Sequence, residues 1–214
     1  MANKYIFLFD LDGTLLNTDI HYTPIWSRIG EEYLGLKDFG NTIKGVSLDG
    51  IFCKYFKDNQ KAQAEIRARV QKFEREELPF EPIKGAREFL SAVKKAGYPS
   101  AIVTSSDKVK MAITHERCPW LQGLVDIILT GEDFERAKPD PDCFLKGMKA
   151  LGGIPENTIV FEDSIHGLAA GRASGAKVVG LATSYPKEFL SDKCHMAIDD
   201  FRDLGIEDLL TDLY

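Results

Sequence analysis

Along most of the chain, short apolar runs follow stretches in which apolar residues recur at helical spacing. Short apolar runs that end in polar residues predict buried strands over residues 4–9, 101–103, 125–129, 158–161, 177–181 and 196–198. Apolar residues at helical spacing predict helices before and between the later strands, and glycines such as Gly97 and Gly175 mark helix ends. Strands alternating with helices are typical of the α/β class, here a doubly wound, Rossmann-like parallel sheet with right-handed crossovers.

A second pattern, without a strand signal, fills residues 17–80. Apolar residues recur at helical spacing in three stretches, 25–34, 51–56 and 66–73. The segment ends at Pro79 and Pro82, and proline does not continue a helix. We therefore predict a small all-helical cap domain, residues 17–80, inserted into an α/β core domain formed by residues 1–16 and 81–214.

Composition and charge exclude several classes of protein. The chain has 214 residues, of which 44% are hydrophobic and 28% charged, as in an ordinary soluble domain. The net charge of −6, without a lysine- or arginine-rich block, argues against nucleic-acid binding. No signal-like or membrane-spanning apolar run is present, and the four cysteines form no C-x-x-C pair. We expect a cytoplasmic protein with no membrane partner; a monomer fits these data, although the sequence does not determine the oligomeric state.

Candidate chemistry begins directly after the first predicted strand, at Asp10, Asp12, Gly13 and Thr14. Side chains two residues apart on an extended chain point the same way, so both aspartates can face one cavity. Two carboxylates at so short a distance repel each other unless a cation lies between them. Mg²⁺ prefers such oxygen ligands. Gly13 permits a sharp turn and close approach to a ligand. This stretch predicts a site for Mg²⁺ and an anion.

Three further polar clusters follow later strands: Thr104 with Ser105, Lys138 after a loop, and Glu162 with Asp163. In a doubly wound sheet these strand ends meet at one crevice. Together they suit phosphoryl transfer, because a carboxylate can attack phosphorus while a metal and Lys138 neutralise the developing charge. Thr104 and Ser105 can hold the phosphate oxygens through hydroxyl and backbone N–H groups.

These motifs, in this order and over the whole chain, resemble those of the haloacid dehalogenase superfamily of phosphatases and phosphomutases. The matching segments are Asp10-Leu11-Asp12-Gly13-Thr14, Ile102-Val103-Thr104-Ser105, Lys138-Pro139 and Glu162-Asp163-Ser164.

The resemblance implies a role for each matched residue. Asp10 becomes the nucleophile that forms an aspartyl phosphate, and Asp12 the general acid and base. Mg²⁺ is implied to bind the Asp10 carboxylate, the Asp12 backbone carbonyl and Asp163, with Glu162 as a further ligand or immediately behind the ligands. Gly13, Thr104, Ser105 and Lys138 are implied to bind phosphate.

An inserted helical cap resembles the group that contains β-phosphoglucomutase and phosphoglycolate phosphatase. Lys44-Gly45-Val46-Ser47 resembles a cap segment of the mutase, but the mutase arginine after this serine is Leu48 here, and its cap histidine falls on Tyr22. A mutase must retain and turn a bisphosphate, so a missing cationic clamp favours a phosphatase. We expect Tyr22, Lys44 and Ser47 to contact the substrate.

Three alternative assignments are disfavoured. A receiver-type phospho-acceptor module also uses acidic residues, threonine, lysine and Mg²⁺, but its acceptor lies on the third strand, whereas Asp10 follows the first. A non-catalytic relative is disfavoured because every motif residue is present, and the dehalogenase branch because it lacks the second aspartate, Asp12. The expected function is a Mg²⁺-dependent phosphatase acting on a small phosphorylated metabolite such as a sugar phosphate, with a hexose phosphate mutase as the alternative.

Overall fold

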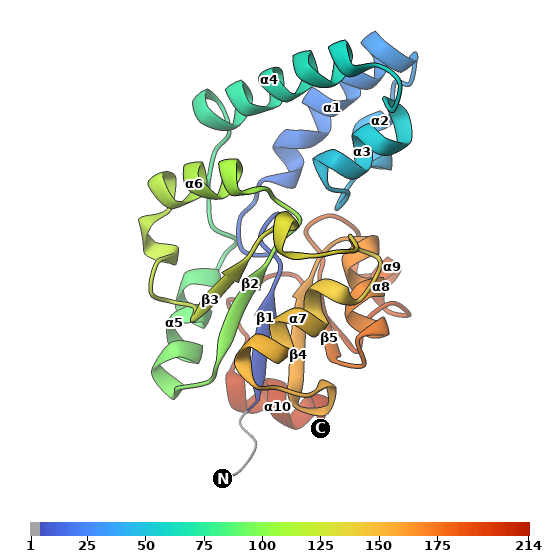
Figure 1. Ribbon diagram of the computed structural model, residues 1–214. Helices are drawn as coiled ribbons and strands as arrows, with labels where there is room; N and C mark the ends of the chain where they lie inside the picture. The colour runs from blue at the N-terminus through green and yellow to red at the C-terminus, as the bar shows by residue number, and fades with distance from the viewer. Residues whose placement is uncertain (1–4) are drawn as a thin grey trace.

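A six-stranded sheet forms the centre of the computed structural model, which describes residues 5–214 (Figure 1). Lys4, expected to begin the first strand, lies outside the described residues. All pairings in the sheet are parallel and the strand order is β3-β2-β1-β4-β5-β6, so the predicted α/β fold is confirmed. The strands are β1 (Ile6–Phe9), β2 (Ser100–Val103), β3 (Ile127–Leu129), β4 (Thr158–Glu162), β5 (Lys177–Leu181) and β6 (Met196–Ile198).

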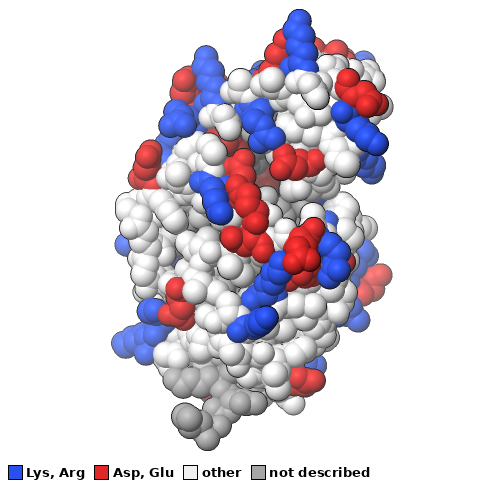
Figure 2. Space-filling view, viewed as in Figure 1, with Lys and Arg blue, Asp and Glu red and all other residues white. Residues whose placement is uncertain are grey.

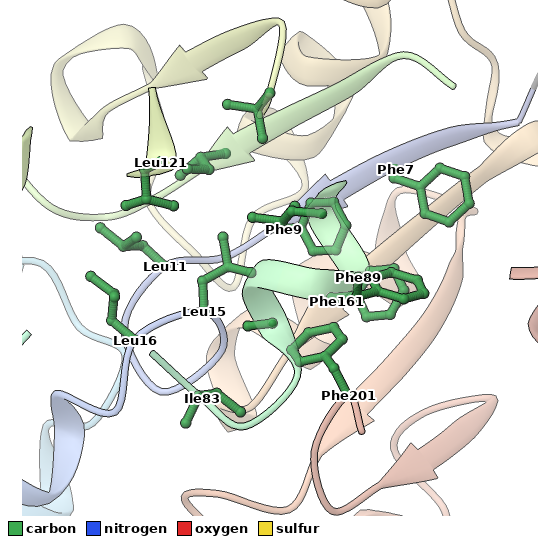
Figure 3. Close-up of a cluster of buried hydrophobic side chains, with 14 of the residues drawn as sticks. Phe7, Phe9, Leu11, Leu15, Leu16, Ile83, Phe89, Leu121, Phe161 and Phe201 are labelled. Atoms are coloured by element: carbon green, nitrogen blue, oxygen red, sulfur yellow. The ribbon is translucent and has the colours of Figure 1, made fainter. Parts of the chain in front are cut away.

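Both faces of the sheet are buried, which explains why its strands read as unbroken apolar runs. Successive side chains of β1 point to opposite faces: Phe7 and Phe9 belong to one hydrophobic cluster, and Ile6 and Leu8 to another. The first cluster is rich in phenylalanine (Figure 3). Within it, the rings of Phe9 and Phe161 on neighbouring strands stack with centroids 4.7 Å apart, which ties β1 to β4 directly below the polar residues that follow both strands.

Helices cover both faces of this sheet, as the alternating pattern predicts. Residues of α5 and α10 pack in the phenylalanine-rich cluster, and residues of α7 and α8 in the opposite one. The described helices of this part are α5 (Ala86–Ala96), α6 (Lys108–Arg117), α7 (Asp142–Leu151), α8 (Ile165–Ala173), α9 (Lys187–Leu190) and α10 (Ile206–Leu213), with 3₁₀ turns at Pro119–Leu121, Gly131–Asp133 and Pro155–Asn157. The four-residue α9 was not predicted, since so short a segment shows no periodicity, and β3 starts two residues later than expected.

Four helices between β1 and α5 lie together beyond the carboxyl ends of the strands (Figure 1): α1 (Asp19–Leu34), α2 (Phe39–Thr42), α3 (Leu48–Tyr55) and α4 (Gln60–Glu76). They enclose a hydrophobic cluster of their own, which includes Trp26, Phe39 and Ile66. Among residues 5–214, no helix is long and apolar enough to cross a membrane.

Two chain segments join these helices to the sheet, and they run side by side. The Asn17 backbone N–H donates to the Glu81 carbonyl (2.8 Å) and the Ile83 N–H to the Leu15 carbonyl (2.9 Å). Adjacent connections of this kind form a natural hinge, because a few residues there can absorb a rotation. The division into a core domain (1–16 and 81–214) and a cap domain (17–80) remains a proposal.

Candidate active site

The site lies where the strand order reverses, between β1 and β4. In this sheet β1 is followed outward by β2 and β3 on one side, and by β4, β5 and β6 on the other. Ligands of doubly wound sheets bind outside the carboxyl ends of the strands at such a switch point. Asp10 and Asp12 follow β1 directly, while Glu162 ends β4 and Asp163 comes next.

The loop after β1 is shaped around Gly13. Its φ of 74° lies in the left-handed region, where a side chain is strained, and a Cβ at this position would overlap the Asp163 carboxylate. The Gly13 N–H donates to the Leu16 carbonyl at 2.8 Å, and its carbonyl accepts from the Thr183 hydroxyl. Gly13 thus brings the two acidic loops into contact, and its direct contact with a phosphate remains a prediction.

Glu162 organises the opposite side of the switch point. Its side chain is completely buried, and Oε1 accepts from Lys138 Nζ at 2.6 Å. Oε2 accepts from the backbone N–H groups of Asp163 and Ser164 and from the Ser164 hydroxyl, each at 3.0 Å. Both carboxylate oxygens are therefore engaged by donors of the protein, which fits a residue that holds Lys138 and the loop in place better than a direct metal ligand.

Lys138 joins the two acidic strand ends. Besides Glu162, its Nζ contacts Asp10 Oδ1 at 2.6 Å and the Val103 carbonyl at 3.3 Å, and only 3% of its side chain is exposed. Burial disfavours the charged ammonium, yet Asp10 and Glu162 outweigh this effect and raise the pKa of Lys138 above its usual value. Lys138 therefore stays cationic beside the predicted nucleophile.

Asp10, Glu162 and Asp163 form a buried cluster whose ligand oxygens lie within 4.8 Å of one another. Burial, with a contribution from Glu162, raises the pKa of Asp10 to about 8 although Lys138 opposes the shift. Burial and repulsion by the neighbouring carboxylates of Asp19, Glu162 and Asp10 also raise the pKa of Asp163 well above its usual value. Carboxylates that destabilise one another in this way suit a divalent cation, which would neutralise them.

Asp163 is the better candidate ligand beside Asp10, because Glu162 accepts from the Lys138 ammonium and from three further donors, whereas each Asp163 oxygen accepts from a single hydroxyl group. Its Oδ1 accepts from the Thr14 hydroxyl at 3.0 Å, and its Oδ2 from the Ser184 hydroxyl, which also donates to Asp19. The roles predicted for Asp10, Asp12, Glu162 and Asp163 as Mg²⁺ ligands remain predictions.

Asp12 occupies a different electrostatic environment from Asp10. Its Oδ1 accepts from the Thr18 hydroxyl and from Lys110 Nζ, the latter at 2.6 Å, and its Oδ2 accepts from the Ser106 hydroxyl at 2.8 Å. Burial alone raises the pKa of Asp12, but Lys110 and these hydroxyls lower it below its usual value. The opposite pKa shifts show that Asp10 and Asp12 lie in different electrostatic environments, so the two carboxylates can take different roles.

Sequence reasoning missed the three donors that hold Asp12. Thr18 and Ser106 lie in loops, where no periodicity marks them. Lys110 carried a signal, because it falls three residues before Ile113 and so shares a helix face with an apolar residue. A lysine at an apolar helix position indicates a buried partner, but the identity of that partner depends on how the distant loops fold.

Three of the four predicted phosphate-binding residues, all except Gly13, border one cavity of about 490 Å³ together with Asp10 and Asp12. Thr104 is buried, and its hydroxyl oxygen accepts from the Ser106 N–H at 3.0 Å, which leaves its hydrogen able to donate to a ligand. Ser105 and Lys138 line the same cavity. The fold therefore brings Thr104, Ser105 and Lys138 beside Asp10, although phosphate binding by them remains a prediction.

Cap helices form the other wall of this cavity, where Tyr22, Lys44, Ser47 and Leu48 are lining residues. The Tyr22 hydroxyl donates to Glu74 Oε1 on α4 at 2.7 Å, and the Ser47 hydroxyl accepts from the Gly50 N–H as the N-terminal cap of α3. On the visible surface, acidic side chains gather beside the hollow between the cap helices and the sheet (Figure 2). Among the described residues that line the cavity, the cations are lysines and none is an arginine.

Comparison with known proteins identifies the family. The sequence profile of the haloacid dehalogenase-like hydrolases matches residues 7–181. The chain belongs to this family. Validoxylamine A 7'-phosphate phosphatase of Streptomyces hygroscopicus subsp. limoneus is 32% identical over 198 residues, covering 86% of this chain and 89% of that protein. Hexitol phosphatase A of Escherichia coli (strain K12) is 31% identical over 182 residues, covering 82% of each protein.

Solved structures agree with this assignment. A β-phosphoglucomutase from Clostridium difficile superposes with a TM-score of 0.78 over 98% of this chain and 97% of its own, at 21% identity, which shows a shared fold. The predicted superfamily, with neighbours of the β-phosphoglucomutase type, is confirmed. The chain is an enzyme of this family, a phosphoric monoester hydrolase.

Proposed function

We propose that this haloacid dehalogenase-like hydrolase is a Mg²⁺-dependent phosphatase that hydrolyses a small phosphate monoester through an aspartyl-phosphate intermediate on Asp10. The observation that carries the proposal is the arrangement at the β1–β4 switch point. There the Asp10 carboxylate lies in a buried acidic cluster and 2.6 Å from the Lys138 ammonium, while Asp12 lies on the same loop with separate partners.

The reaction proceeds in two displacements. A carboxylate oxygen of Asp10 attacks phosphorus, the bond from phosphorus to the ester oxygen breaks, and Asp12 gives its proton to the leaving alcohol. Asp12 then takes a proton from water, whose oxygen attacks the same phosphorus. The acyl phosphate bond breaks, and inorganic phosphate and the Asp10 carboxylate are released. Lys138, with Thr104 and Ser105, holds the transferring phosphoryl oxygens.

Mg²⁺ bound by Asp10 and Asp163 would neutralise the charge that develops on the phosphoryl oxygens. This chain prepares that position, because the cluster has more buried carboxylates than Lys138 alone can neutralise. Thr14 and Ser184 orient Asp163 by donating to its two oxygens. Removal of such hydrogen-bond partners commonly lowers metal affinity by about 10- to 100-fold.

The cavity supports a phosphatase over the alternative mutase. A mutase must hold a second phosphate while its bisphosphate intermediate turns, and arginine is the side chain best suited to that task. Leu48 occupies the position of the mutase arginine, and the described cavity lining includes only lysines as cations. Two of them, Lys110 and Lys138, are paired with Asp12 and Asp10 respectively.

The proposed substrate is the monophosphate of a sugar or related polyol. Two relatives are named for phosphates of this kind, validoxylamine A 7'-phosphate and hexitol phosphate. The cavity can serve such hydroxyl-rich molecules, because Tyr22, Glu74 and Gln71 present hydrogen-bonding groups on its cap side. A cytoplasmic location and a monomeric state remain predictions.

Release of inorganic phosphate from a panel of hexitol, hexose, glycerol and glycolate monophosphates, with Mg²⁺ and after its removal by chelation, tests this function. We expect turnover of polyol or sugar monophosphates that needs Mg²⁺, and none in Asp10→Asn, whose folding is checked by circular dichroism. Undiminished activity of Asp10→Asn would refute the assigned nucleophile. In parallel, β-glucose 1-phosphate with a trace of the 1,6-bisphosphate should yield phosphate; rapid formation of glucose 6-phosphate would instead establish the mutase.

A further inference from the structure

Lys110 occupies a position at the site that the family motifs do not explain. It lies on α6, outside the four motifs, yet its Nζ is 2.6 Å from Asp12 Oδ1 and only 8% of its side chain is exposed. Asp12 also receives hydrogen bonds from Thr18 and Ser106. The donors reach Asp12 from three segments, which are the loop after β1, the loop after β2, and α6.

The same ammonium group contacts the cap. Lys110 Nζ lies 4.5 Å from the centroid of the Tyr22 ring on α1, a distance at which a cation is attracted to the ring face. The Tyr22 hydroxyl in turn donates to Glu74 on α4 at 2.7 Å, and the side chain of Glu74 is buried. Lys110 is therefore enclosed between the proton-transfer residue on one side and two cap helices on the other.

We propose that Lys110 is a positioning residue for Asp12: it holds the carboxylate toward the ester oxygen of the substrate, and Tyr22 holds Lys110 when the cap covers the site. This inference rests on the proposed phosphatase function. In this proposal Lys110, on the core helix α6, orients Asp12. The cap residues act only through Lys110: Tyr22 contacts Lys110, and Glu74 contacts Tyr22.

A cation beside Asp12 can assist the proton transfer to the leaving group. Asp12 carries the proton that it took from water in the preceding second displacement. When it gives this proton to the leaving alcohol it becomes a carboxylate, and the neighbouring ammonium stabilises that charge. The benefit depends on the leaving group: an alkyl oxygen needs the proton, whereas p-nitrophenolate departs without it. Stability alone offers little reason for the pair, because the cost of burying two charges offsets most of their attraction.

The decisive experiment compares Lys110→Met with the wild type on two substrates, p-nitrophenyl phosphate and the best alkyl monophosphate of the panel. The quantity to measure is kcat/KM, because it reports the first displacement and excludes hydrolysis of the phosphoenzyme, which both substrates share. We expect kcat/KM for the alkyl ester to fall by about 10- to 100-fold, as for a misplaced acid catalyst. For the nitrophenyl ester it should fall by less than about threefold, since this ester needs little acid catalysis.

Lys108→Met is the matched control, because Lys108 is exposed on the first turn of the same helix, and it should leave both values unchanged. Lys110→Arg, which keeps the cation, should restore part of the selectivity for the alkyl ester. An equal fall for both esters in Lys110→Met would overturn the positioning role and leave a merely structural one. A crystal structure of Lys110→Met in which the Asp12 carboxylate keeps its place would overturn it too, independently of turnover. Failure of the wild type to release phosphate from either ester would instead refute the proposed function.

Discussion

Gly167, in the first turn of α8, offers a sharp test of the site because it lies against Glu162. A Cβ built on Gly167 would overlap the Glu162 carboxylate. That carboxylate has no free direction to move, since Oε1 contacts Lys138 at 2.6 Å and Oε2 accepts three hydrogen bonds at 3.0 Å. In Gly167→Ala the new methyl group must therefore push Glu162 away and carry Lys138 with it.

The expected magnitudes follow from this geometry. Overpacking of a buried site costs about 1–3 kcal/mol, and alanine stabilises a helix relative to glycine by up to about 1 kcal/mol. Gly167→Ala should therefore lose about 0–3 kcal/mol of unfolding free energy. A displacement of Lys138 by about 1 Å should reduce kcat on the order of 100-fold. The variant would thus be folded but nearly inactive.

The assay combines steady-state phosphate release with urea unfolding, and Gly171→Ala on the same helix is the control. The atoms nearest to a Cβ there are Cγ2 of Val178 at 3.0 Å and Cγ1 and Cβ of Val160 at 3.2 Å and 3.5 Å, which are apolar and belong to no catalytic residue. Gly171→Ala should therefore keep wild-type kcat with a stability change of about 1 kcal/mol or less. Wild-type kcat in Gly167→Ala would refute the view that Glu162 positions Lys138.

Two further predictions concern the carboxylates. Asp163→Asn removes one charge from the acidic cluster and should raise the Mg²⁺ concentration for half-maximal activity about 10- to 100-fold, as measured by metal titration of phosphate release; an unchanged titration would exclude Asp163 as a ligand. Asp12→Asn lacks the base for the second displacement, so p-nitrophenyl phosphate should give a burst of about one nitrophenol per enzyme followed by slow turnover in rapid-mixing experiments. Full steady-state turnover without a burst would assign the base to another residue.

The catalytic centre was largely predictable because its chemistry is local to strand ends. Each of Asp10, Thr104 and Glu162 follows or ends an apolar run, and a parallel sheet must bring such ends to one edge. The alternation of strands and helices, which determines the class of fold, arises from burial of both sheet faces, and that burial is readable as unbroken apolar strands. Lys138 was harder to assign, since a lysine before a proline in a loop has no pattern of its own; the strand-end clusters and the family resemblance together marked it.

The residues that surround the catalytic aspartates depend on contacts between segments far apart in the chain. Lys110 is 98 residues from Asp12, and Tyr22 is 52 residues from Glu74. Neither pairing produces a periodicity or a motif, because each joins segments that only the folded chain brings together: α6 and the loop after β1 for Lys110 and Asp12, and α1 and α4 for Tyr22 and Glu74. The shortness of α2 and α9 has the same origin: tertiary packing, rather than propensity, stabilises four-residue helices.

By itself, the sequence determined the α/β class, the inserted run of helices, and the set of strand-end residues that make a phosphoryl-transfer site. These properties follow from hydrophobic periodicity and from the rule that parallel strands end at the same edge. Only the tertiary structure decided which cation faces which carboxylate: Lys138 joins Asp10 to Glu162, while Lys110 pairs with Asp12. The physical reason is that the strength of an electrostatic interaction depends on the distance between the two groups in space. For segments far apart in the chain, that distance is fixed only when the chain has folded.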